Sequence, residues 1–190
     1  MPFISSFASR SLGLAAAAAV AAIAGCAHAP SPLNRIAVAY STIYGPAGES
    51  RGTIELWQDT DNIVHVRMQL HDLTPGDHGI HFHAVGKCEG AGATPFATAG
   101  AHYNPIGRMH GLLNPAGPHA GDAPNITAGA DGRVDAGFTT DRATLTAGST
   151  TLFDADGSAI VIHAGADDQT SQPAGNAGAR VACGVLRKAL

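Results

Sequence analysis

Hydrophobic and polar residues alternate along much of the chain after residue 34, most clearly between positions 63 and 71. Every second position in this stretch is apolar, namely Val64, Val66, Met68 and Leu70. Because successive side chains of a strand point to opposite faces, this period of two predicts a strand with one buried face. The pair Asp61-Asn62 comes directly before the stretch and predicts the turn that leads into it.

Strand-like patterns interrupted by turn signals recur along the chain. We expect further strands at residues 35–43, 53–57, 133–139, 158–163 and 180–186, and a hairpin turn at Asp131-Gly132. Helical periodicity is absent after the first 25 residues. The pattern therefore predicts an all-β domain of antiparallel strands.

One long segment, residues 84–125, has no strand pattern and is rich in Gly, Ala and Pro. A loop of this length without secondary structure is uncommon inside a compact domain, so it needs another source of order. The segment contains Cys88, three histidines and Asp122. We expect metal coordination and this cysteine to hold it in place.

The chain begins with a predicted export signal. An apolar run at residues 12–24 follows Arg10, and it is shorter than the about 20 residues that span a bilayer. The run ends in Ile-Ala-Gly-Cys, which resembles the lipobox of bacterial lipoproteins and predicts cleavage before Cys26 with lipidation of that residue. The alternative is an ordinary signal peptide cut near residues 27–29. Either way the domain is exported.

Three parts are therefore expected along the chain. Residues 1–25 are a signal peptide of lipoprotein type, residues 26–33 are a small, proline-bearing tether, and residues 34–190 are one domain. The expected location is the periplasm or cell envelope, with membrane contact only through a lipid on Cys26. A mature chain with 10 basic and 15 acidic residues offers no basic face for nucleic acid.

The cysteine count agrees with export. With Cys26 lipidated, Cys88 and Cys183 remain as a single pair, which is expected to form a disulfide in an oxidising compartment. In the cytosol both would stay free thiols.

The spacing of the histidines outlines two metal sites that share a residue. His81 and His83 are two positions apart, so on a strand both imidazoles project from one face. His163 ends an apolar run where a strand would deliver another imidazole, a ligand type that suits copper and zinc. A second set has the three imidazoles and one carboxylate of a closed tetrahedral zinc site, namely His102, His110, His119 and Asp122.

Several strings resemble copper-zinc superoxide dismutases and cover nearly the whole mature chain. They are HGIHFH at 78–83, AGAHYNP at 99–105, PHAGDAPNI at 118–126 and GNAGARVACGVL at 175–186. The resemblance implies a Greek-key antiparallel β-sandwich or flattened barrel of about eight strands with two long functional loops. It also implies an enzyme that disproportionates superoxide into dioxygen and hydrogen peroxide.

The resemblance assigns roles by matched position. Copper falls to His81, His83, His102 and His163, and zinc to His102, His110, His119 and Asp122, so His102 bridges the two metals and takes part in catalysis. Asp167 matches a carboxylate that links ligands of the two metals, Arg180 a catalytic arginine beside copper, and Cys88 with Cys183 the family's disulfide. His78 matches a histidine that hydrogen-bonds the backbone and binds no metal.

The sequence is compatible with one rival function. A copper- and zinc-binding lipoprotein without catalytic turnover is the rival function, and the protein is expected to be a monomer or a homodimer. Because residues 164–178 contain no Lys or Arg, we expect Lys87 or Arg108 to attract the anionic substrate. His28, His65 and His71 are expected to be solvated.

Overall fold

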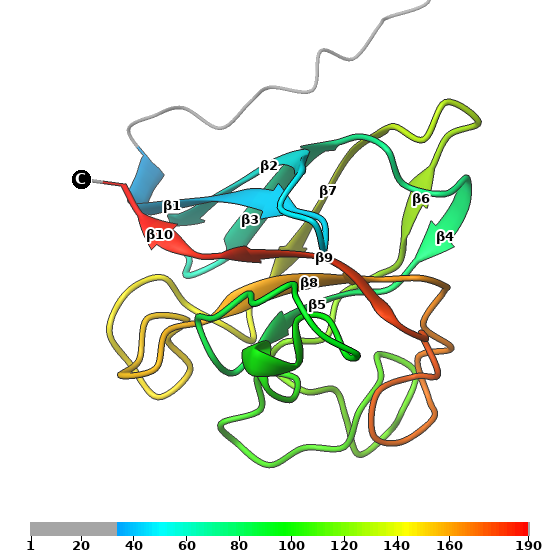
Figure 1. The fold of residues 1–190 in the computed structure, drawn as a ribbon. Coiled ribbons are helices and arrows are strands. Elements are labelled where there is room, and N and C mark those ends of the chain that lie inside the picture. The colour runs from blue at the N-terminus through cyan, green and yellow to red at the C-terminus, as the bar shows by residue number, and fades with distance from the viewer. Residues whose placement is uncertain (1–33, 190) are drawn as a thin grey trace, which may run out of the picture.

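The computed structural model describes residues 34–189, which form a domain of strands and long loops (Figure 1). The predicted signal peptide, Cys26, His28 and the tether through residue 33 lie outside the described residues. The strands are β1 Arg35–Tyr44, β2 Ser50–Asp59, β3 Val64–Leu70, β4 Gly76–His78, β5 Ile80–His83, β6 Ile126–Ala128, β7 Val134–Thr140, β8 Ala159–His163, β9 Arg180–Val185 and β10 Arg187–Lys188. A short 3-10 helix, η2, spans Ala97–Ala99. Within this part of the chain, no helix has the length and apolar character of a membrane span.

Eight strands form one sheet in the order β5-β8-β9-β1-β2-β3-β7, with β10 pairing with β1, and β4 and β6 form a separate pair. β1, β2 and β3 follow one another, and β9 returns to pair with β1, which is a Greek-key order. The antiparallel sheet curls, so that side chains from its two end strands meet across the core: the ring centroids of Phe82 on β5 and Phe138 on β7 are 6.3 Å apart. The expected flattened antiparallel barrel is confirmed.

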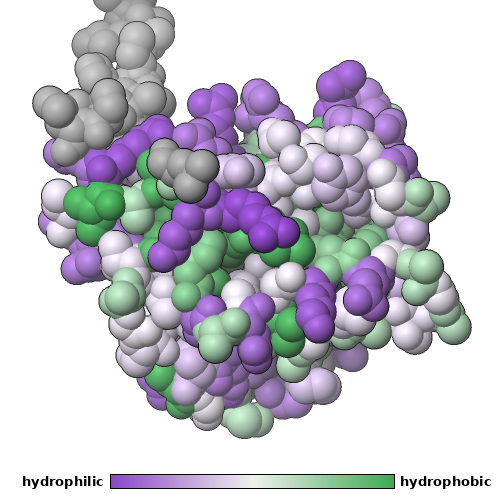
Figure 2. All heavy atoms as spheres, turned by 60° about the vertical axis from the view of Figure 1, so that its left-hand side comes forward, coloured by the Kyte–Doolittle hydropathy of each residue, from purple (hydrophilic) through white to green (hydrophobic). Residues whose placement is uncertain are grey.

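The alternation that predicted β3 is reproduced in its burial. Val64, Val66, Met68 and Leu70 are buried in the main core, and the residues between them face outward. In the view of Figure 2, the hydrophobic residues at the surface form separate patches among hydrophilic ones. The predicted turn is also present, because Asn62 adopts a left-handed backbone (φ 64°) where β2 turns into β3.

Two expectations about local structure need correction. Asp131-Gly132 does form a turn, but β6 before it pairs with β4 and β7 after it pairs with β3, so the two strands make no hairpin. His65 is only partly solvated, because its ring stacks on Trp57 directly across from it (5.1 Å between centroids) and its Nε2 lies 2.7 Å from Asp59.

β5 and β8 are buried on both faces, so side chains on each face are shielded from solvent. Ile80, Phe82, Ile160 and Ile162 point into the main core. The residues between them, His81 and His83 on β5 and Ala159 and Val161 on β8, point to the other face. This second face is covered by loops.

The long loop (residues 84–125) contains no strand beyond isolated bridges, as expected. The predicted disulfide between Cys88 and Cys183 is confirmed and joins this loop to β9, with a Cα–Cα distance of 5.6 Å. A small second hydrophobic cluster surrounds the bridge and consists of Phe96, Ala99, Ala159, Val161 and Cys183. The loop is therefore tied down beside the face that carries His81 and His83.

Candidate metal centre

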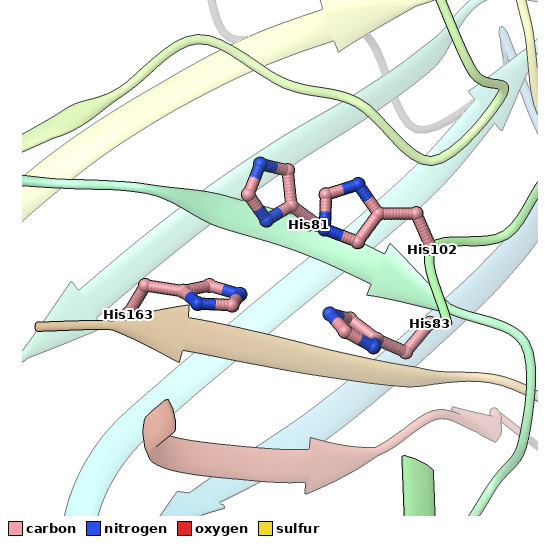
Figure 3. A group of neighbouring side chains, drawn as sticks. All are labelled: His81, His83, His102 and His163. Carbon is pink, nitrogen blue, oxygen red and sulfur yellow. The ribbon is translucent and has the colours of Figure 1, made fainter. Parts of the chain in front are cut away.

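Four histidines from distant parts of the chain converge on one buried point (Figure 3). His81 and His83 come from β5, His163 from the end of β8 and His102 from the long loop. Each offers a nitrogen within 4.8 Å of the others. We call them the four-histidine group.

The nitrogens that face this point are His81 Nδ1, His83 Nε2, His102 Nε2 and His163 Nε2, and each is buried without a hydrogen-bond partner. Buried polar atoms are nearly always paired, because leaving one unpaired costs about 1–3 kcal/mol. Four unpaired nitrogens around one point match the donor set of a metal ion that imidazole favours, such as copper or zinc.

A second set, the Asp122 group, consists of His102, His110, His119 and Asp122. The Nδ1 atoms of the three histidines lie 3.0, 3.0 and 3.3 Å from Oδ1 of Asp122. Ligand atoms bound tetrahedrally at zinc distances lie about 3.4 Å apart. The Asp122 group therefore fits a tetrahedral ion. His102 belongs to both groups, with one ring nitrogen in each.

Asp122 is held in its ionised form. Its burial opposes ionisation, but hydrogen bonding with His102, His110 and the backbone N–H of Gly111 keeps the pKa of its carboxyl well below the usual range. The N–H groups of Gly111 and His119 both donate to Oδ2, at 2.8 and 2.9 Å. Oδ1 is thereby left facing the three histidine nitrogens.

Burial favours the neutral form of three rings in the four-histidine group. It lowers the pKa of His81 to about 4 and that of His163 to about 3, and it also holds the pKa of His83 well below 6.5. These rings are neutral at pH 7, the form that binds a metal ion. His110 differs: its burial lowers its pKa, but hydrogen bonds to Asp122 and Asp167 raise it to about 9.

Asp167 joins the two groups through a buried carboxylate. His81 Nε2 donates to its Oδ2 at 2.7 Å, and His110 Nε2 donates to its Oδ1 at 3.1 Å. With its Nε2 engaged, His81 directs Nδ1 to the four-histidine group, and His110 directs Nδ1 to Asp122 at 3.0 Å, so the carboxylate fixes the orientation of both rings. Gly175 packs so closely against Asp167 that a Cβ there would collide with Oδ1, so a larger residue would displace this carboxylate.

Backbone carbonyls orient the remaining rings. His83 Nδ1 donates to Gly100 at 2.9 Å and His163 Nδ1 to Gly178 at 3.2 Å, which leaves each Nε2 pointing inward. His78 belongs to neither group, as expected. Its Nδ1 lies 2.6 Å from the carbonyl oxygen of His163 and its Nε2 2.7 Å from that of Thr74.

A hollow of about 380 Å³ opens over the four-histidine group. Its lining consists of His83, Ala101, His102, Asn104, His119, His163, Pro173, Ala174 and Arg180. Arg180 is half-buried and is the one Lys or Arg among these lining residues. Lys87 and Arg108 do not line the hollow, so their part in attracting the substrate stays a prediction.

Side-chain amides that the sequence did not predict join the long loop to the β8–β9 loop (residues 164–179). The carboxamide of Gln172 pairs with both the N–H and the carbonyl of His110, each at 2.9 Å. Asn125 pairs in the same way with the backbone of Asp167 at 2.9 and 2.8 Å. Gln169 reaches the N–H of Leu112. Nothing in the sequence distinguishes these amides from other loop residues.

The fold and the site together define the class: an antiparallel β-barrel protein with two adjacent metal-binding groups. The family model for copper/zinc superoxide dismutase (SODC) matches residues 50–186. The chain therefore belongs to the copper/zinc superoxide dismutase family, which uses copper and zinc.

The similarity extends over most of the chain. The sequence is 42% identical over 150 residues to superoxide dismutase (Cu-Zn) 1 of Aquifex aeolicus, which covers 78% of this chain and 86% of that protein. It is 43% identical over 143 residues to superoxide dismutase (Cu-Zn) of Caulobacter vibrioides, with coverages of 74% and 80%. A solved double mutant of a SOD-like protein from Bacillus subtilis has a TM-score of 0.72 and 37% identity, over 77% of this chain and 95% of that one.

Proposed function

We propose that this chain disproportionates superoxide at copper held by the four-histidine group, beside zinc held by the Asp122 group. The observation that carries the proposal is the position of His102. Its Nε2 is one of four unpaired buried nitrogens, while its Nδ1 lies 3.0 Å from Asp122. The ring of His102 thus has one nitrogen in the four-histidine group and one in the Asp122 group, and we assign it as the ligand shared by both metals.

The reaction converts two superoxide anions and two protons into dioxygen and hydrogen peroxide. Copper, when bound, supplies the electron transfer by alternating between its two oxidation states. The residues of the chain must then bind an anion, orient it and deliver one of the two protons, while the other comes from solvent water.

His102 is the proposed proton carrier. With a cation in each group, both ring nitrogens would be engaged and the ring would be held as an imidazolate, because two cations offset the cost of the second deprotonation. If Nε2 were freed, it could take up a proton while Nδ1 stays beside Asp122. Nε2 would then give this proton to the peroxide product.

Arg180 is the proposed anion-binding residue. A net charge of about −5 on the mature chain repels superoxide globally, so attraction must come from local positive charge. Arg180 lines the hollow over the four-histidine group, where its guanidinium can donate hydrogen bonds to a small anion.

We further propose that the mature protein is a lipoprotein of the periplasm or cell envelope, anchored through Cys26. The sequence signals of residues 1–26 support this location. The Cys88–Cys183 disulfide supports it as well, because such bonds persist in oxidising compartments.

The test of the proposed function is superoxide decay catalysed by residues 27–190, purified and loaded with copper and zinc, beside the same preparation stripped of copper. Rapid decay that depends on copper supports the enzyme. Tight binding of both metals without faster decay would instead support the copper- and zinc-binding lipoprotein without turnover.

A further inference from the structure

The guanidinium of Arg180 is held by two backbone carbonyls that flank the short helix η2. Nη1 donates to the carbonyl of Phe96, the residue before the helix, at 2.6 Å. Nη2 donates to the carbonyl of Gly100, the residue after it, also at 2.6 Å. Arg180 belongs to β9, but its guanidinium is oriented by hydrogen bonds to the long loop.

Phe96 places its carbonyl through an unusual backbone. Its φ of 61° and ψ of 17° are left-handed, a conformation that bulky residues rarely adopt because Cβ crowds the following carbonyl. The ring is 1% exposed and belongs to the second hydrophobic cluster around the Cys88–Cys183 disulfide. Burial of the ring offsets the backbone strain and keeps the carbonyl aimed at Arg180.

The carbonyl of Gly100 connects the same helix to the four-histidine group. It accepts a hydrogen bond from His83 Nδ1 at 2.9 Å in addition to the one from Arg180. A shift of η2 would therefore move the arginine relative to the inward-facing Nε2 of His83.

We propose that Phe96 is a positioning residue for Arg180: its buried ring fixes η2, so that the two flanking carbonyls aim the guanidinium at the hollow. Phe96 does not itself line the hollow, so it acts through Arg180. This inference rests on the proposed copper site.

The test is a titration of the copper- and zinc-loaded protein with azide, a small anion, followed by its charge-transfer absorption with copper. Phe96→Leu keeps an apolar side chain but changes the shape of the anchor. We expect it to weaken azide binding about fivefold, which corresponds to about 1 kcal/mol of a charged hydrogen bond. Phe138→Leu makes the same substitution at a partly buried residue on β7 that packs against the main core, and it should leave azide affinity unchanged.

A double-mutant cycle separates action through Arg180 from general loosening. In an Arg180→Ala background, Phe96→Leu should have no further effect on azide affinity. The inference is overturned if Phe96→Leu folds, loads both metals and binds azide as the unsubstituted protein does, or if its effect persists in the Arg180→Ala background. Absence of the copper–azide band from the unsubstituted protein would overturn the proposed copper site and this inference together.

Discussion

One oxygen of Asp167 accepts a 2.7 Å hydrogen bond from Nε2 of His81, while the ring of His81 presents Nδ1 to the four-histidine group. The other oxygen of the same carboxylate serves His110 of the Asp122 group. A single buried carboxylate therefore orients one ligand of each proposed metal.

Replacement of Asp167 should loosen both sites. Partners that orient metal ligands typically contribute 10- to 100-fold in metal affinity, so Asp167→Asn should lower zinc affinity by about that factor. A chelator competition for zinc measures it. Asp168→Asn is the matched control, because Asp168 accepts from the turn amides of Thr170 and Ser171 and touches no histidine. Equal zinc affinities in the two variants would contradict the role of Asp167.

The paired amide of Gln172 offers a second prediction. Gln172→Met keeps the length of the side chain but removes both hydrogen bonds to the backbone of His110, at about 1 kcal/mol each. We expect a loss of about 2 kcal/mol in the free energy of unfolding and faster release of zinc. Gln69→Met, at an exposed site on β3, is the control and should change neither quantity. Unchanged zinc release in Gln172→Met would count against the loop contact.

Loss of the disulfide should destabilise the whole domain. Cys88 and Cys183 are 95 residues apart, and a loop of that length corresponds to about 4–5 kcal/mol in the chain-entropy model. Denaturant unfolding of Cys88→Ala should show a loss of this order. A loss below about 1 kcal/mol would show that other contacts already hold the long loop to β9.

The metal-free protein should lose stability in mild acid. The folded-state pKa of His81 is lowered to about 4 and that of His163 to about 3, so on unfolding these rings take up protons below about pH 6.5. Their contribution is present above pH 6.5 and is lost as the pH falls toward 4. His110 has the opposite sign, because its pKa is raised to about 9 and its contribution fades as the pH rises through that value.

Denaturant midpoints of the chelator-treated protein between pH 6.5 and 4.5 check the acid limb. In this window the carboxyl groups of Asp122 and Asp167, whose pKa values are lowered, stay ionised. A midpoint that does not change across the window would contradict the burial of neutral histidines.

The strands that line the core were predictable because their burial follows the alternation of the sequence, as Val64 to Leu70 shows. β4 and β6 were missed, since three residues are too few to display a period. The same pattern placed His65 correctly on the outer face. It could not show that Trp57 lies opposite and covers the ring, because that depends on strand register.

The candidate site was predictable to the extent that its chemistry depends on local spacing. His81 and His83 share a face because they are two residues apart on a strand. Residue type and spacing placed His102 and Asp122 in one zinc set, and the resemblance supported it, but their 3.0 Å contact across 20 positions of the long loop arises only in the folded chain. The roles of Gln172 and Phe96 could not be predicted, because they arise only from contacts made in the folded chain.

The most direct test of the shared ligand His102 is electron paramagnetic resonance. The protein would carry copper(II) in the four-histidine group and cobalt(II) in the Asp122 group. If His102 bridges the two ions as an imidazolate, magnetic coupling through its ring should abolish the copper signal when cobalt binds. A full copper signal with cobalt present in the Asp122 group would contradict the shared histidine and the two-metal centre built on it.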